Sequence, residues 1–111
     1  MATREEVEGK EENSLTYVVE ADGTPVGRLR VVRTDEELLI AGIQILPVYQ
    51  RKGIGSEVIR SLMGEAKRNA LPVRLEVEKD NPDAKRLYLR LGFRVIQERN
   101  DRELREVRFG V

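Results

Sequence analysis

The 111-residue chain contains no cysteine and no histidine. Without cysteine it can form no disulfide bond, no thiolate nucleophile and no cysteine-ligated zinc site. Without histidine it lacks the side chain that most often acts as a general base near neutral pH. Acid–base chemistry must therefore use Asp, Glu, Lys or Tyr. Only scattered carboxylates remain as metal ligands, so we expect no metal cofactor.

Aromatic residues are few, and neither sign of charge is in excess. The chain has three Tyr, two Phe and no Trp, and its 20 basic residues balance its 20 acidic residues. A nucleic-acid-binding surface usually needs a basic face or a stacking platform, so we expect no nucleic-acid partner. No apolar run is long enough to cross a bilayer, and residues 1–13 do not resemble a signal peptide. We therefore expect a cytoplasmic protein with no membrane partner.

Three consecutive strands are predicted in the first half of the chain. Residues 1–13 are polar and charge-rich, and we expect them to be a flexible segment ahead of a single domain over residues 14–111. Strand-forming residues predict a hairpin over residues 15–32 that turns at Asp22-Gly23. A third apolar run covers residues 38–46. The short turns between these segments indicate an antiparallel meander.

Helices alternate with strands in the second half. Apolar side chains at helical spacing predict one helix from Gly53 to about Asn69, and a second over residues 82–91 that ends at Gly92. Further strands are expected over residues 73–77, 93–96 and 104–109. The order β-β-β-α-β-α-β-β predicts an α+β fold with a mixed, mostly antiparallel sheet. The two strands that flank the first helix should form a parallel pair at its centre.

The stretch VYQRKGIGSEVI places Gly53 and Gly55 where the first helix should begin. Glycine is a poor helix former, but it lets a ligand come close to the backbone. The unpartnered N–H groups at a helix start bind anions, of which phosphate is the commonest. Arg51 and Lys52 add positive charge beside them. These residues alone fit a diphosphate cradle and a tight turn with two solvated cations equally well.

The element order and two motifs together resemble the GNAT superfamily of acetyl-CoA-dependent N-acetyltransferases, over about residues 14–109. The phosphate-binding signature of that family, Q/R-x-x-G-x-G/A, matches residues 50–55, with the expected Pro47 ahead of it. The second motif is a strand reading L-E-V, then Asn, a small residue and L-Y-x-x-x-G-F. It matches residues 75–77, Asn81, Ala84 and residues 87–93.

The resemblance implies that acetyl-CoA is the co-substrate. Its pyrophosphate would bind backbone N–H groups of the glycine loop, and its pantetheine arm would enter the gap between the two splayed parallel strands. Asn81 would contact this arm in addition to capping its helix, although a cap alone also explains an Asn at that position. The implied cofactor-binding residues are Ile43, Ile45, Leu46, Gln50, Arg51, Lys52, Gly53, Ile54, Gly55, Ser56, Asn81 and Tyr88.

The implied chemistry needs no protein nucleophile, because a free amine can attack a thioester directly. An alkylammonium has a pKa near ~10.4, so a base must take its proton at neutral pH, and the leaving thiolate must receive one. Tyr88 matches the family acid, although an aromatic on the apolar stripe of a helix is more often core. Glu76, 12 residues earlier, has the Glu–Tyr spacing of the ribosomal-protein alanine N-acetyltransferases in this family. It is the candidate base, or equally a solvated carboxylate paired with Arg74 or Lys79.

One departure from the family concerns the acceptor side. Members usually begin with a strand and helices that build much of the acceptor wall, whereas only about a dozen mostly polar residues precede Leu15 here. The resemblance is therefore to a short form that lacks these elements. The acceptor would be a protein N-terminus, a lysine or a small amine, or a homodimer would complete the wall. A non-catalytic acetyl-CoA-binding scaffold and a small module without a cofactor are the alternatives.

Overall fold

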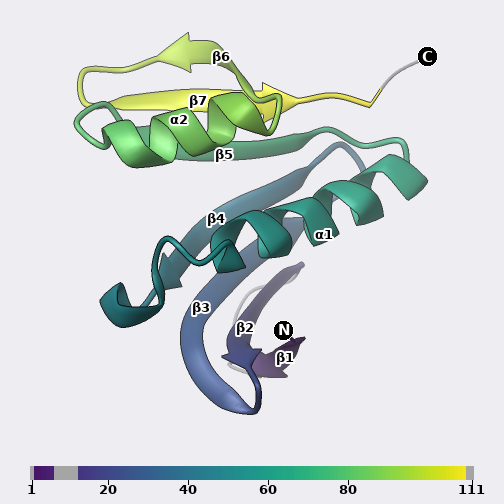
Figure 1. Cartoon of the computed structure of the whole chain (residues 1–111). Helices are drawn as coiled ribbons and strands as arrows, with labels where there is room; N and C mark the ends of the chain where they lie inside the picture. The colour runs from purple at the N-terminus through teal and green to yellow at the C-terminus, as the bar shows by residue number, and fades with distance from the viewer. Residues whose placement is uncertain (1, 7–12, 110–111) are drawn as a thin grey trace.

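A single seven-stranded sheet, in the order β1-β2-β3-β4-β5-β7-β6, forms the body of the protein. The computed structural model describes residues 2–6 and 13–109. The strands are β1 Ala2–Glu6, β2 Ser14–Ala21, β3 Thr24–Arg33, β4 Leu38–Ile45, β5 Val73–Glu78, β6 Arg94–Glu98 and β7 Arg102–Val107. The helices are α1 Ile54–Arg68 and α2 Pro82–Arg90, with a 3-10 helix η1 at Pro47–Tyr49. Both α-helices lie on the same face of the sheet (Figure 1).

The predicted α+β fold with a mixed, mostly antiparallel sheet is confirmed. The β4–β5 pair is parallel, whereas the other neighbouring strands of the described sheet run antiparallel. The expected meander is β2, β3 and β4, and the expected crossover from β4 to β5 passes through α1. Gly92 has a φ of 95°, the left-handed conformation expected where the second helix ends.

The prediction of a flexible segment over residues 1–13 is wrong for residues 2–6. These residues form β1, which pairs antiparallel with β2 from Ala2↔Glu20 to Glu6↔Thr16. The first strand that the resemblance was expected to lack is therefore present, while Met1 and residues 7–12 lie outside the described residues. An edge strand is held by backbone hydrogen bonds and needs no apolar stripe. Its polar composition therefore gave no signal of a strand.

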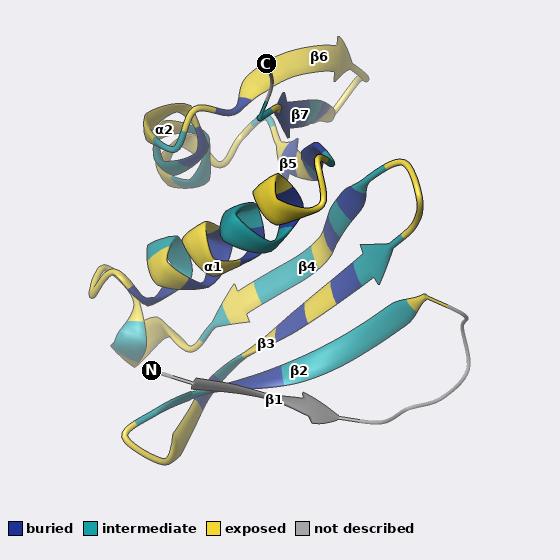
Figure 2. Cartoon of the chain, turned by 90° about the vertical axis from the view of Figure 1, so that its right-hand side faces the viewer, coloured by how far each residue is buried: buried dark blue, intermediate teal, exposed yellow. Residues whose placement is uncertain are grey.

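Apolar side chains gather between the helices and one face of the sheet, which we name the helix face. The buried residues of α1 are Ile54, Val58, Ile59, Leu62 and Ala66. They meet the alternate residues Val73, Leu75 and Val77 of β5, which are also buried. Figure 2 shows the buried stripe of α1 turned towards the strands, whereas β6 is exposed along its whole length.

The opposite face of the sheet, which we name the open face, is held by ion pairs. The Nη1 atom of Arg74 lies 2.7 Å from the Oε1 atom of Glu37, and its Nε lies 2.8 Å from Oε2 of Glu106. Arg74 and Glu106 are directly opposite each other on β5 and β7. Charged side chains therefore occupy this part of the open face.

The central strands β4 and β5 separate as the resemblance implies. They pair only at Leu38↔Val73, Leu39↔Arg74 and Ile40↔Leu75. In the β3–β4 ladder the register shifts at Ala41, because Arg30 opposes Gly42 whereas Val31 opposes Ile40. A bulge of this kind bends its strand and increases the local twist. Residues 41–45 of β4 therefore diverge from residues 76–78 of β5, and a slot opens between them.

A second ion pair joins the meander to α1 and should make stability depend on pH. The Arg33 guanidinium donates to both carboxylate oxygens of Glu65, at 2.6 and 3.0 Å, and to the hydroxyl of Tyr17. Hydrogen bonding from Arg33 lowers the pKa of Glu65, although partial burial opposes this. A lowered folded-state pKa stabilises the protein above the unfolded Glu pKa of about 4.3, and this stability is lost as the pH falls through and below that value.

We expect Glu65→Gln to lower the free energy of unfolding by about 1 kcal/mol at pH 7. Urea denaturation at pH 7 and at pH 3 measures this, and the difference from wild type should shrink at the lower pH. Glu36→Gln, at an exposed turn position, is the control and should change little. An equal deficit of Glu65→Gln at both pH values would show that the carboxylate charge does not contribute.

Candidate active site

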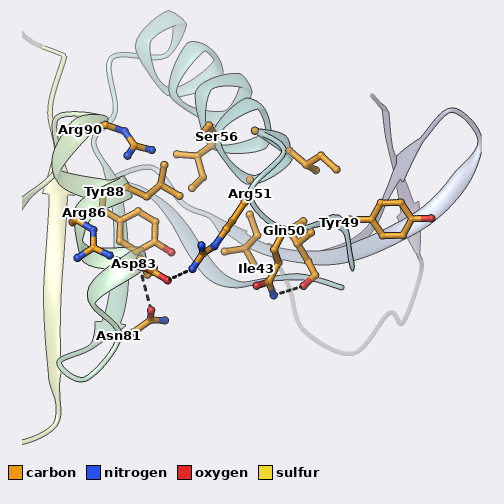
Figure 3. A pocket seen from close by; sticks show the side chains of 17 residues that line it. Ile43, Tyr49, Gln50, Arg51, Ser56, Asn81, Asp83, Arg86, Tyr88 and Arg90 are labelled. Carbon is orange, nitrogen blue, oxygen red and sulfur yellow. Dashed lines mark hydrogen bonds and ion pairs between the residues drawn. The ribbon is translucent and has the colours of Figure 1, made fainter. Parts of the chain in front are cut away.

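A cavity of about 540 Å³, the helix-side pocket, lies between the end of β4, the start of α1 and one side of α2. Figure 3 shows its lining side chains converging from these three elements. The structure brings most of the predicted cofactor-binding residues together here, namely Ile43, Ile45, Gln50, Arg51, Gly53, Ile54, Gly55, Ser56, Asn81 and Tyr88. Leu46 and Lys52 are the two that do not line it.

Glycine is needed at positions 53 and 55 of the loop for two different physical reasons. Gly53 has a φ of 82°, so the turn into α1 itself requires glycine there. Gly55 lies inside α1, and a Cβ at this position would meet no protein atom within 4 Å. A glycine in a helix costs about 1 kcal/mol relative to alanine. A tight turn therefore explains Gly53 but not Gly55, whose missing side chain leaves space at the helix start.

Backbone donors surround this space. No side chain caps α1, and the N–H of Glu57 bonds to the carbonyl of Gly53 at 3.0 Å. The N–H groups of Ile54, Gly55 and Ser56 precede that bond and have no acceptor within the helix. All three residues line the helix-side pocket. Together with the helix dipole they form a site suited to a phosphate or diphosphate group.

Arginines supply the positive charge at this site. The Nη2 atom of Arg51 lies 3.3 Å from the Oδ2 atom of Asp83, so the pair joins the loop to α2 (Figure 3). Arg86 bonds the same carboxylate, and Arg90 lies one turn further along α2 on the pocket wall. Lys52, which the sequence placed at the site, instead has its ammonium 5.8 Å from the ring centre of Tyr49.

Arg86 and Arg90 are the residues that the sequence interpretation missed. Both line the helix-side pocket. Residues four apart on a helix lie on one side of it. Their spacing, on the helix that carries Asn81 and Tyr88, was the signal that could have identified them.

The backbone of β4 corrects one further prediction. The N–H of Leu46 donates to the carbonyl of Val26 at 2.8 Å, so this N–H cannot bind a pantetheine arm. Alternate residues of an antiparallel strand send their polar groups to the same side. The backbone N–H of Leu46 points to β3. The backbone groups of Ile45 and Ile43, one and three residues earlier, therefore point to the opposite side, towards the slot. The side-chain amide of Gln50 donates to the carbonyl of Ile45 at 2.9 Å, which leaves the N–H of Ile45 for a ligand.

Tyr88 belongs both to the core and to the pocket. Its side chain is buried, and its ring centre lies 5.9 Å from that of Phe93. Its hydroxyl nevertheless points into the helix-side pocket (Figure 3). Burial raises the pKa of this hydroxyl, and the charge of Arg105 offsets part of the effect. The hydroxyl is therefore protonated at neutral pH, as a proton donor must be.

A second cavity of about 630 Å³, the slot pocket, lies where β4 and β5 diverge. Glu76, Glu78 and Arg102 line it from the open face, and Tyr88 lines it from the helix face. Tyr88, Asn81, Ala84 and Ile43 border both this cavity and the helix-side pocket. The slot therefore connects the two faces of the sheet, and the predicted pair Glu76 and Tyr88 lines a single cavity.

The surroundings of Glu76 differ from those expected. Its carboxylate oxygens lie 3.7 Å from Nη1 of Arg99 and 3.7 Å from Nη1 of Arg102. The expected partner Arg74 instead pairs with Glu37 and Glu106. Both observed partners come from the end of the chain, where β6 turns into β7. At 3.7 Å the contacts are ion pairs without short hydrogen bonds.

Asn81 caps the N-terminus of α2, as the sequence predicts. Its Oδ1 atom accepts a hydrogen bond from the N–H of Ala84 at 3.2 Å. Asn81 also borders both cavities, so its side-chain amide donor lies beside the slot.

Clustered metal ligands and membrane-spanning helices are both absent from the described residues. Residues 2–6 and 13–109 contain no group of three or more His, Cys, Asp or Glu side chains that could hold a metal ion. Within the same part of the chain, no helix is long and apolar enough to cross a bilayer.

Known proteins resemble this chain in sequence and in fold. The sequence model of the acetyltransferase (GNAT) family matches residues 2–93. A mycothiol acetyltransferase from Actinosynnema mirum is 32% identical over 87 residues, which are 77% of this chain and 29% of that protein. The chain therefore spans less than a third of the length of this relative.

Two solved structures share the fold. The ribosomal-protein-S18-alanine N-acetyltransferase of Escherichia coli has a TM-score of 0.81 at 23% identity, over 92% of this chain and 73% of that chain. A GNAT family acetyltransferase of Elizabethkingia anophelis with acetyl-CoA bound has a TM-score of 0.81 at 13% identity, over 97% of both chains. At these identities the structures establish the fold, and the match to the family model over most of the sequence establishes the membership. The protein belongs to the GNAT acetyltransferase family.

Proposed function

We propose that the protein transfers the acetyl group of acetyl-CoA to a primary amine. The observation that carries this proposal is the slot between β4 and β5, where a pocket on each face of the sheet meets at Tyr88. A donor bound on the helix face and an acceptor bound on the open face would then place their reacting atoms together. Holding two reactants in this way is a large part of catalysis of a bimolecular reaction.

Acetyl-CoA fits the helix-side pocket by its chemistry. Its pyrophosphate would take the N–H groups of residues 54–56, and Arg51, Arg86 and Arg90 would neutralise its phosphate charge. Its pantetheine arm would lie along the free edge of β4 and bond the backbone of Ile43 and Ile45, as an added strand would. The solved family structure of similar length with acetyl-CoA bound supports this assignment.

The chemical step would use Glu76 and Tyr88. The amine nitrogen attacks the thioester carbonyl, so that a C–N bond forms as the C–S bond breaks. Glu76 takes the first proton that the ammonium group loses, and Tyr88 gives its hydroxyl proton to the departing thiolate. The nitrogen loses a second proton as the amide forms, and this proton returns to the Tyr88 oxygen. Product release and exchange with water then restore the Glu76 carboxylate.

The acceptor would approach from the open face, where the slot pocket opens. A protein N-terminus, a lysine side chain or a small amine carries the required nucleophile. A homodimer would matter if the second copy completed the acceptor wall, and light scattering at the assay concentration distinguishes dimer from monomer. The alternative is a non-catalytic acetyl-CoA-binding scaffold, in which the carboxylate of Glu76 only forms ion pairs with Arg99 and Arg102.

A thiol-release assay tests the proposal. The protein contains no cysteine, so a thiol reagent reports only the coenzyme A that is released. With acetyl-CoA and pooled amines and peptides we expect steady thiol release that depends on the acceptor. Calorimetric binding of acetyl-CoA without release would instead establish the scaffold, and no binding at all would remove acetyl-CoA from the account.

A further inference from the structure

A third cavity, of about 620 Å³, lies at the C-terminal end of β4 and has no role in the proposed reaction, although it shares Ile45 and Gln50 with the helix-side pocket. We name it the β4-end hollow. It is lined by Val18, Pro25, Gly27, Arg28, Gln44, Ile45, Leu46, Pro47 and Gln50. Val18 opposes Arg28, and Arg28 opposes Gln44, so these three side chains share one face of the sheet. That face is the open face, because their neighbours Leu29 and Ile43 pack into the helix-face core.

The β4-end hollow continues the slot pocket along β4. The slot pocket is lined by residues 39–44 of this strand and the hollow by residues 44–47, so the two meet at Gln44. From Ala41, beside the slot, to Leu46 is about 16 Å at ~3.3 Å per strand residue. Both α-helices lie on the other face of the sheet (Figure 1). A small amine would fill the slot alone, whereas an extended peptide of about five residues would span the groove.

The two ends of the groove differ in chemistry. At the slot end the carboxylates of Glu76 and Glu78 can attract an ammonium group, which would compete with Arg102, their ion-pair partner on the same cavity wall. At the far end the lining is mostly apolar, with Val18 almost fully buried and the Leu46 side chain half exposed. An exposed apolar side chain beside a hollow is a favourable contact for another apolar side chain. The groove therefore matches an amine followed, some residues later, by an apolar side chain.

We infer that the acceptor is an extended polypeptide whose N-terminal amine enters the slot and whose fourth or fifth side chain, an apolar one, occupies the β4-end hollow. The inference rests on the proposed acetyl transfer and specifies its acceptor. The hollow would act as a specificity subsite remote from the reacting atoms.

Peptide length tests the inference. Amidated peptides of one, two, four and six residues share the same N-terminal residue and are assayed by thiol release with saturating acetyl-CoA. From two to six residues kcat/KM should rise about tenfold when residue five is Leu, which corresponds to burying one apolar side chain. With Asp at residue five the increase should be absent. Equal kcat/KM at all lengths would overturn the inference and leave the proposed function intact, whereas no turnover of any acceptor would overturn the proposed function itself.

A matched pair of variants adds an independent test. Pro25 is an exposed residue of the hollow lining, and its neighbour Thr24 is exposed but does not line the hollow. Pro25→Glu should raise KM for the Leu-containing hexapeptide about tenfold and leave the dipeptide unaffected. Thr24→Glu should change neither. A Pro25→Glu enzyme with unchanged KM for the hexapeptide would show that the peptide does not reach the hollow.

Discussion

Tyr88→Phe is expected to lower kcat by about 100-fold or more, because removing a positioned general acid typically costs a factor of 10² to 10⁴. The substitution removes only the hydroxyl, and the ring keeps its contact with Phe93. The dissociation constant for coenzyme A and the unfolding midpoint should therefore stay close to wild type. Single-turnover thiol release measures the chemical step directly. A variant with the full rate would show that another group, or water, protonates the thiolate.

The same residue gives an expectation for the pH dependence of the rate. Burial raises the pKa of the Tyr88 hydroxyl above its usual value of about 10. The acid form therefore persists through neutral pH and is lost only as the pH rises through that raised value. We expect wild-type kcat to show no loss on the alkaline side below about pH 10. A fall near pH 7 or 8 would indicate that a different group supplies the proton.

Gly55→Leu is the second substitution with a large expected effect, on cofactor binding. Its side chain would occupy the space beside the N–H groups of residues 54–56, where the pyrophosphate is proposed to lie. We expect the dissociation constant for acetyl-CoA, measured by calorimetry, to rise about 100-fold, since several charge-assisted hydrogen bonds are lost. The apoprotein should fold normally, because a Cβ at Gly55 meets no protein atom.

Gly55→Ala and Gly64→Ala form the matched control for that experiment. Both glycines lie in α1, and a Cβ at Gly64 would make only an ordinary contact, 3.5 Å from a guanidinium nitrogen of Arg68. Each alanine should raise the free energy of unfolding of the apoprotein by about 0.5–1 kcal/mol. Only Gly55→Ala should weaken acetyl-CoA binding. If both variants bind as wild type does, the loop of Gly55 is not the phosphate site.

Much of the fold could be predicted from the sequence because its signals are local. The apolar spacing of α1, the Asn81 cap and the left-handed Gly92 each specify a short stretch of backbone, and each is observed. The splay of β4 from β5 has no local signal and was implied only by the family resemblance. Ala41, whose bulge produces it, is an ordinary residue in an apolar run.

The remaining site features depend on contacts between distant parts of the chain. Glu76 pairs with Arg99 and Arg102 across the sheet, and no spacing along the sequence brings them together. Lys52 was placed at the site by proximity in sequence, but its side chain turns to Tyr49. The strand β1 was missed because the backbone of β2, rather than an apolar pattern, fixes it.

The proposed reaction requires acetyl-CoA to bind with its pyrophosphate at the start of α1 and its arm along the free edge of β4. Backbone amide NMR of the labelled protein, with and without coenzyme A, tests it most directly. We predict slowed hydrogen exchange and large shift changes at the amides of residues 54–56, Ile43 and Ile45, with little change at the Leu46 amide, which already bonds to Val26. Binding that leaves the amides of residues 54–56 and Ile43 unchanged would contradict the account.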